Sequence, residues 1–448
     1  MGTLAPRLVL LAALCALASA SQAESLLDFY RKALESSPAL RIREFGIDQA
    51  RAQEDLARSR LLPQLSASSA YYWNDYHESA LPPREYTGER SSLQARQALL
   101  DLASYYKLEG ARFSLAQSEQ QREAALMTLA GDVVDRYLAV LLAEDEILNL
   151  RAEKDAIKSQ LARLRFMRER QLAKVTDLLE VEAQYQGLLT REIEADNARA
   201  VALERLREVS GLPAEHVAPL VRQILPAVAG EEQAWVSKAT SNNPNLVALQ
   251  NAIEAAAKLV ESGRAEHMPQ LALTATQTHS NQGYDNRLTP PYNVTTLGLQ
   301  LTIPLYEGGR VQATVSEASA RLAIAREQYE AARRETERDA RTAYLGAAAN
   351  HARIGSTDAE VRALEKVLQA QQRSYELGVS TIVDVLIAQR RLFKSRSDRS
   401  KARYGYIRDL TTLRARAGTL SMSDIEEIDG WMAASGRGES AVALPPGS

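Results

Sequence analysis

The sequence contains almost no cysteine, few aromatic residues and little net charge. Cys15 is the only cysteine among 448 residues, and aromatic residues make up 6% of the chain. Cys15 lies in an N-terminal segment that is predicted below to be removed. The mature chain would then have no cysteine, and it could form no disulfide, no thiolate zinc site and no thiol nucleophile. The net charge of −3 argues against the basic surface that nucleic-acid binders need, so we expect no nucleic-acid partner.

Catalytic and metal-binding motifs are also missing. The sequence contains no HExxH, no GxSxG and no phosphate-binding loop. Its five histidines are scattered: His77, His216, His267, His279 and His351. We therefore predict that the protein is not an enzyme and that it needs no cofactor and no metal.

A continuous apolar run occurs only at the N-terminus. Arg7 precedes the run "LVLLAALCALASA", and small residues follow it, so residues 1–23 are predicted to be a signal peptide cleaved before Glu24. Leu14 before Cys15 is too large for a lipoprotein signal. No later segment approaches the ~18 apolar residues of a membrane-spanning helix. If this exported protein crosses a membrane, it must use strands.

The chain is a tandem duplication. "SSPAL" (36–40) recurs as "NNPNL" (242–246), and "LPQL" (62–65) recurs as "MPQL" (268–271), both at an offset of 206 residues. "TDLLEVEAQ" (176–184) matches "TIVDVLIAQ" (381–389) at an offset of 205. We predict a first structural repeat at 24–230, a second at 231–420, and a disordered tail at 421–448, which contains "GRGES" and "LPPGS".

Each repeat is expected to begin with a helix, at 39–60 or 245–266, which a proline ends. A β-hairpin follows. Apolar and polar residues alternate in its strands, most clearly in "TLGLQLTI" before Pro304. Polar loops with Pro82-Pro83 or Pro290-Pro291 are predicted to join the strands, which gives four strands in the whole chain.

Long helices should fill the rest of each repeat. No proline occurs between Pro83 and Pro213 or between Pro304 and Pro445. Residues ~101–171 and ~177–210 are predicted to be helical, and apolar residues between 126 and 164 show coiled-coil-like spacing. The apolar positions that carry this spacing are Leu126, Val133, Tyr137, Val140, Ile147, Leu150, Ile157, Leu161 and Leu164.

Four strands cannot close a barrel in lipid, and an open sheet edge there is very unfavourable. The chain is therefore expected to oligomerise, and three copies would supply twelve strands. Pro304 would end the last strand, while Gly308 and Gly309 would let the backbone turn into a long helix.

The sequence resembles the TolC family of outer-membrane efflux proteins over residues 24–420. The resemblance rests on the duplicated "SPAL…LPQL" and "NPNL…MPQL", on "PLYEGG" and on "YELGVSTIVDVL". It implies a mixed α and β membrane protein: a homotrimer with a 12-stranded β-barrel in outer-membrane lipid and a long coiled-coil α-helical barrel in the periplasm. Such a protein is the outer-membrane exit duct of a tripartite efflux or type I secretion system. Its expected partners are a periplasmic adaptor and an inner-membrane transporter, and its cargo is drugs or polypeptides.

The resemblance also implies a gate where the helical pairs turn. Asp384 matches the acid at the pore constriction, and Thr176, Asp177 and Tyr375 match partners in links that hold the closed state. A ring of Asp384 carboxylates would attract cations, and their repulsion would raise their pKa values. This chain departs from the family pattern at Ser380, where a basic residue is expected, and at Ile387, where a second acidic ring can occur.

Simpler explanations remain open. Asp384 and Asp177 could cap helices without any gate, because both follow hydroxyl residues near a helix start. Tyr375 could simply pack between helices. The main alternative function is a periplasmic adaptor, which also has coiled-coil hairpins but usually only one hairpin among small β domains.

Overall fold

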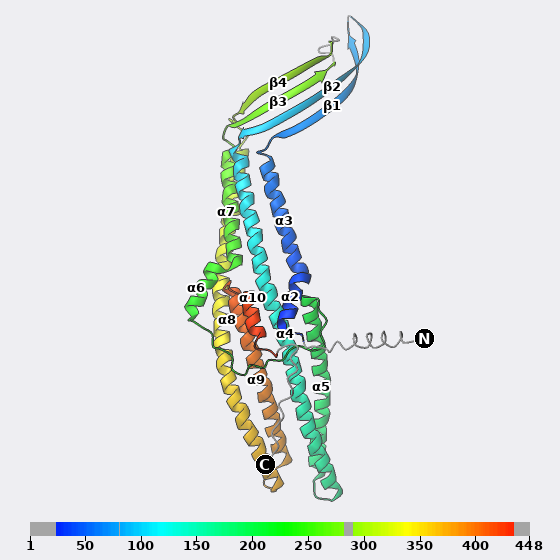
Figure 1. Ribbon diagram of the computed structural model, residues 1–448, viewed down its shortest axis with the longest axis vertical. Coiled ribbons are helices and arrows are strands. Elements are labelled where there is room, and N and C mark those ends of the chain that lie inside the picture. The colour runs from blue at the N-terminus through cyan, green and yellow to red at the C-terminus, as the bar shows by residue number, and fades with distance from the viewer. Residues whose placement is uncertain (1–23, 80, 282–289, 434–448) are drawn as a thin grey trace, which may run out of the picture. The chain divides into compact units, whose positions relative to one another are not determined.

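The computed structural model describes residues 24–79, 81–281 and 290–433 (Figure 1). The predicted signal peptide, 1–23, lies outside these ranges. The chain divides into two compact units, each described here by itself. The first comprises the described residues of Met1–Leu40, Ala124–Asn243 and Glu335–Ser448, and the second comprises those of Arg41–Glu123 and Pro244–Arg334.

The order of elements repeats along the chain. The first half contains α2 (Leu26–Ser36), α3 (Pro38–Ser59), β1 (Gln64–Glu78), β2 (Leu81–Leu100), α4 (Leu102–Glu169) and α5 (Val175–Ser210). The second half contains α6 (Glu232–Asn242), α7 (Pro244–Ala265), β3 (Gln270–Ser280), β4 (Tyr292–Thr302), α8 (Arg310–Glu376) and α9 (Ile382–Arg416). Each compact unit contains segments of both halves, so the repeats are not the spatial units.

The predicted helices agree closely with the observed ones. Helices α3 and α7 begin at prolines, whose fixed φ suits the first helical position and whose missing N–H would be unpaired there anyway. Helices α4 and α8 have 68 and 67 residues. Helices α2 and α6 were not expected. Among the described residues, no helix is long and apolar enough to cross a membrane.

The apolar spacing along α4 marks its buried side. Of the nine positions named from the sequence, eight are buried. Leu126 is partly buried against the core that contains Val133, Tyr137 and Val140. Tyr137 lies at the centre of that core, where its ring meets Phe29 edge to face at 5.9 Å. Its hydroxyl donates a 2.8 Å hydrogen bond to the Ala218 carbonyl, which satisfies a polar group that burial would otherwise leave unpaired.

The core of the first unit also includes residues from the predicted tail. Helix α10 (Met422–Asp429) starts at a capping box formed by Ser421 and Asp424, and it buries Ile425 and Ile428 completely. Trp431 is 2% exposed. The prediction of disorder is wrong for 421–433, because these apolar side chains complete a core that composition alone did not indicate. Residues 434–448 lie outside the described residues.

The second unit contains one antiparallel sheet in the order β1-β2-β3-β4, with the strands side by side (Figure 1). Strand β2 begins earlier than expected, at Leu81, so Pro82 and Pro83 lie in the strand rather than in a loop. They fall where the β1–β2 register shifts, between the Tyr76–Arg84 and Glu78–Leu81 pairs. A bulge tolerates proline because the ladder needs no N–H from the extra residue.

The two faces of the sheet differ in character. The register aligns Leu271 with Leu301, Leu273 with Leu299, and Ala275 with both Leu297 and Ala95. On this apolar face the leucines of β4 are exposed, Leu297 at 73%. Gln97 is a polar residue among these apolar ones, and its amide donates a 2.6 Å hydrogen bond to the Leu61 carbonyl beside the sheet. The other face carries mainly serine, threonine, glutamine and arginine.

The junction between β4 and α8 has the geometry that its sequence requires. Strand β4 ends at Thr302, before Pro304, and Gly308 and Gly309 adopt φ of 60° and 83°. These left-handed values favour glycine, because a Cβ would crowd the following carbonyl. Arg310 then begins α8 and pairs with Glu266 at 2.6 Å.

Candidate functional site at the helical turns

Both helical pairs of the first unit end in short turns. Helix α4 ends at Glu169 and α5 begins at Val175, while α8 ends at Glu376 and α9 begins at Ile382. Each turn contains one left-handed residue: Gln171 at φ 62° and Gly378 at φ 73°. The two turns thus have similar backbone geometry, but the left-handed position is a glycine only in the second turn.

A small apolar core lies next to these turns. It is separate from the core around Tyr137 and draws on α4, α5 and α9, with partly buried side chains of α8 packed against it. Its buried members are Leu150, Ile157, Leu161, Leu164, Val181, Leu188, Ile382, Val385 and Leu386. The four helices are therefore held together by apolar packing close to the point where the chain turns.

Asp384 lies in the first turn of α9 and belongs to a capping box. Its Oδ2 accepts hydrogen bonds from the Thr381 backbone N–H at 2.9 Å and from the Thr381 hydroxyl at 2.7 Å. The Asp384 N–H donates in return to Thr381 Oγ1 at 3.3 Å. These bonds hold the pKa of Asp384 below its usual range, because they favour the charged carboxylate. Helix capping therefore accounts for Asp384 within this chain, and its pKa shifts in the direction opposite to the rise that a ring of carboxylates would cause.

Tyr375 lies between the two helical pairs. Its ring is partly buried against the small core. Burial raises the pKa of its hydroxyl, the Asp177 carboxylate raises it further, and the Arg163 guanidinium opposes this. Arg163 also approaches Glu376 at 3.6 Å. The Asp177 carboxylate thus lies near enough to act on the Tyr375 hydroxyl, and the described position of Tyr375 is that of a side chain packed against the small core.

Thr176 takes little part in this contact. Its exposed hydroxyl is 3.5 Å from Asp177 Oδ1, at the limit of a hydrogen bond. The described contacts of Asp384 are confined to Thr381, so it is not joined to Thr176, Asp177 or Tyr375. Of the four predicted tip residues, the structure brings together Asp177 and Tyr375 and leaves Asp384 apart.

The two departures from the family pattern have plain local roles. The Ser380 hydroxyl donates to the Gln371 carbonyl at 3.3 Å, which ties the turn to the end of α8. Ile387 follows Asp384 by three residues on α9 and is 43% exposed. An apolar side chain therefore shares the exposed side of α9 with the acid, as residues three apart do on a helix.

Exposed apolar side chains at the turns were not predicted. Leu377 and Val379 flank Gly378 and are 70% and 81% exposed, and Leu172 and Leu179 are exposed near the first turn. Their signal in the sequence is a leucine and a valine on either side of a turn glycine, where polar residues are usual. A water-exposed group of this kind indicates a contact surface.

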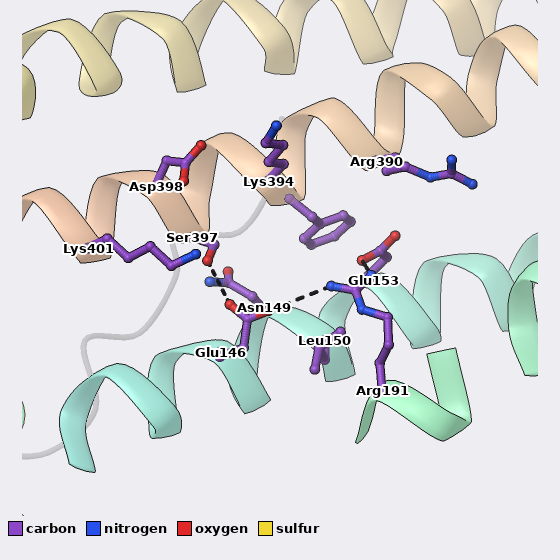
Figure 2. Close-up of a pocket in the computed structure, with 11 residues that line it drawn as sticks. Glu146, Asn149, Leu150, Glu153, Arg191, Arg390, Lys394, Ser397, Asp398 and Lys401 are labelled. Carbon is purple, nitrogen blue, oxygen red and sulfur yellow. Dashed lines mark hydrogen bonds and ion pairs between the residues drawn. The ribbon is translucent and has the colours of Figure 1, made fainter. Parts of the chain in front are cut away.

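A polar cleft lies between α4, α5 and α9 in the same unit, and it has a volume of about 290 Å³. Figure 2 shows Ser397 of α9 facing Glu146 of α4, and Arg191 of α5 extending toward Glu153. Burial raises the pKa of Glu153, whereas the charges of Arg191 and Arg390 lower it. Arg191 lies 3.6 Å from Glu146 and 3.7 Å from Glu153, so its guanidinium partly offsets the charge of both carboxylates and links α5 to α4.

The described residues include no group of three or more His, Cys, Asp or Glu side chains that could hold a metal ion. The chemistry of the turns is thus that of exposed carboxylates, a partly buried tyrosine near a carboxylate, and apolar side chains. Such groups can attract cations and make protein contacts, and they match no catalytic arrangement described above.

Comparison with known proteins places these features in context. The family model "Outer membrane efflux protein" matches residues 29–212 and 235–419, one segment in each half of the chain. TolC, an outer membrane protein of Vibrio cholerae, is 30% identical over 423 residues, which cover 93% of this chain and 96% of that protein. The alkaline protease secretion protein AprF of Pseudomonas aeruginosa is 29% identical over 414 residues, covering 90% of this chain and 86% of AprF.

Among solved structures, the fold is similar to that of CusC. The TM-score is 0.79 at 18% identity, over 88% of this chain and 92% of CusC. At this identity the likeness shows the fold alone.

Proposed function

This chain belongs to the outer membrane efflux protein family and is an outer-membrane channel protein of Gram-negative bacteria, and on that premise we propose that three copies form the exit duct of a tripartite efflux or type I secretion system. The family match favours this function over a periplasmic adaptor. The relative AprF is named for secretion of a protease. We infer that drugs or polypeptides are the cargo here.

The exposed apolar face of the sheet is the observation that supports the proposal. Its apolar face is exposed to the surroundings, and Leu297, Leu299 and Leu301 follow one another along β4 on that face. An exposed apolar band of this kind is suited to lipid. The outer edges of β1 and β4 have no partner strand in the sheet of one chain. Because unpaired backbone groups are very unfavourable in lipid, β4 of one copy would pair with β1 of the next, which closes a 12-stranded barrel.

The helical turns would form the gate of this duct. Three copies of Asp384 around one axis would place carboxylates at the constriction, with Ile387 adding an apolar layer beside them. The contact of Tyr375 with Asp177 would hold the two helical pairs of one chain in the closed arrangement. The exposed apolar side chains at the turns would meet the periplasmic adaptor, and an inner-membrane transporter would supply the cargo.

We further propose that the chain does no catalysis of its own. A duct needs a path and a gate, and the energy for transport would come from the inner-membrane partner. The charged cleft between α4, α5 and α9 would then serve helix packing.

Single-channel recording in a planar bilayer tests the proposal. We expect the mature protein to purify as a trimer and to give small, cation-selective currents. Asp384→Ala should raise the conductance and weaken cation selectivity, whereas Asp384→Glu should keep the selectivity because it keeps the charge. Cation selectivity that is unchanged in Asp384→Ala would reduce Asp384 to a helix cap. A soluble monomer that gives no currents would disprove the duct.

A further inference from the structure

Three arginines form a stripe along β2. Arg84, Arg90 and Arg96 are six residues apart, so all three point to the same face of the sheet, and all three are exposed. They lie on the polar face, opposite the face that carries Leu271, Leu297 and their neighbours. At ~3.4 Å per residue, neighbouring arginines are about 20 Å apart, and the stripe runs along most of the strand.

Over the described ladder from the Tyr76–Arg84 pair to the Gln64–Arg96 pair, the neighbouring strands place no acid opposite these arginines. Across the ladder, Arg84 pairs with Tyr76, Arg90 with Ala70 and Ser280, and Arg96 with Gln64 and Thr274. The remaining positions on this face, over the registered ladder from the Tyr76–Arg84 pair to the Gln64–Arg96 pair, are serine, threonine, glutamine, tyrosine, asparagine, glycine and valine.

Asp75, Glu85 and Glu89 lie on the opposite face. Glu89 stands across from Tyr71 and lies 3.8 Å from His279, and Asp75 lies 3.3 Å from His77. In the part of the sheet that the structure describes, no ion pair involves Arg84, Arg90 or Arg96. The polar face therefore carries three uncompensated positive charges per chain.

Their spacing explains how these charges coexist. At ~0.15 M salt the Debye length is about 8 Å, so arginines about 20 Å apart hardly repel one another. The same charges still act on ions beside them, and a surface lined with one sign of charge concentrates ions of the other sign.

We propose that this arginine stripe lines the sheet-walled part of the duct and makes that part attract anionic solutes, such as cargo bearing carboxylate or phosphate groups. The inference rests on the proposed duct function, because a channel wall turns its apolar face to lipid and its polar face to water. The duct would then have opposite charge preferences in two regions: cationic at Asp384 and anionic along β2.

Reversal potentials in a KCl gradient test the stripe. The background is Asp384→Ala, which removes the carboxylate that otherwise dominates selectivity. In that background we compare three further variants: Arg84, Arg90 and Arg96 all replaced by Gln; the same three replaced by Lys; and Glu89→Gln on the opposite face as a matched control. Arg96→Gln alone serves if the triple Gln variant does not assemble.

We expect the background protein to prefer chloride in low salt. The triple Gln variant should lower the chloride-to-potassium permeability ratio by about two-fold or more at ~0.01 M salt, where the Debye length is about 30 Å. The effect should vanish near 1 M salt, where that length is about 3 Å. The Lys variant and Glu89→Gln should keep the background ratio, and Arg96→Gln should shift it part of the way.

Two results would overturn the inference in different ways. Conducting channels whose permeability ratio is the same with arginine and with glutamine would show that the stripe does not act on permeating ions. If the glutamine variants instead lose insertion into vesicles of lipopolysaccharide while their permeability ratio is unchanged, the arginines contact lipid phosphates. If neither the wild type nor Asp384→Ala forms channels, the result contradicts the proposed duct function rather than the role of the stripe.

Discussion

The turn between α4 and α5 and the turn between α8 and α9 come from corresponding positions of a duplicated chain, yet different interactions hold them. The second turn has a glycine at its left-handed position, a capping box of Thr381 and Asp384, and a buried first helical residue, Ile382. The first has Gln171 at the left-handed position, and its N-cap, Lys174, makes no side-chain cap hydrogen bond.

This difference indicates that the second turn is locally more stable than the first. Ile382 is 1% exposed, whereas Val175, which begins α5, is 45% exposed. A turn that is capped and anchored in a core opens rarely, and a turn that lacks both opens more easily. We infer that the α4–α5 turn is the more mobile of the two, and four measurements test this comparison.

Removal of the buried anchor should have the largest effect. Ile382→Ala should destabilise the tip by about 2–5 kcal/mol, because it removes buried methyl groups and leaves a cavity. Val175→Ala, the matched control, should change stability by no more than about 0.5 kcal/mol. Hydrogen exchange of the amides in the first turns of α9 and α5, read by mass spectrometry, measures both. Equal effects of the two variants would contradict the proposed difference between the turns.

Exchange of the left-handed residues should change the two turns in opposite directions. Gly378→Ala should destabilise the second turn by about 1–2 kcal/mol, because a Cβ is unfavourable at positive φ. Gln171→Gly should relieve the same strain in the first turn, with a net gain below about 1 kcal/mol because glycine also adds flexibility to the unfolded chain. Protease cleavage rates at each turn report the change, and a loss of protection in Gln171→Gly would be inconsistent with strain there.

Loss of the cap should have a smaller effect. Thr381→Val removes the hydroxyl that bonds Asp384 and should weaken the start of α9 by about 1 kcal/mol. Thr176→Val is the matched control in α5, where the hydroxyl makes only a marginal contact, and it should leave exchange there nearly unchanged. Amide exchange in residues 382–386 is the readout. Equal responses to Thr381→Val and Thr176→Val would mean that the capping box does not stabilise the start of α9.

The smallest expected effect is a pH dependence of the second turn. Because the folded pKa of Asp384 is depressed by its bonds to Thr381, its stabilising contribution is present above the unfolded pKa of ~3.9 and is lost as the pH falls through the folded value. The hydrogen-exchange rate of the amides at the start of α9, corrected for intrinsic rates, should therefore rise as the pH falls below ~3.9 and stay constant from pH 5 to 7. Asp384→Asn keeps an acceptor but does not titrate, so its exchange should not show the rise.

The long helices and the hairpins could be predicted because their signals are local and repeated. Proline ends the predicted helices at one end, and the spacing of Val133, Tyr137 and Val140 marks a buried side over many turns. Helices α2, α6 and α10 were missed because each is short, at 11, 11 and 8 residues. At that length the packing of residues such as Phe29 and Ile428 decides whether a helix forms, and packing cannot be seen in a short window of sequence.

The candidate site could be predicted only in part. The resemblance drew attention to Asp384, Asp177 and Tyr375. The structure places the Asp177 carboxylate near enough to raise the pKa of Tyr375, and it bonds Asp384 to Thr381. No role was predicted for the arginines of β2. Their common face became visible once the register aligned β2 with β1 and β3, because the facing residues of a strand depend on where its bulges lie.

The sequence by itself determined the duplication, the four strands and the long helices, because periodicity, proline positions and internal repeats are local features of the sequence. The tertiary structure decided which residues of the two repeats share a compact unit, that 421–433 complete a core, and that one face of the sheet holds arginines without acids. Those features depend on contacts between residues far apart in the chain, and only the folded arrangement brings such residues together.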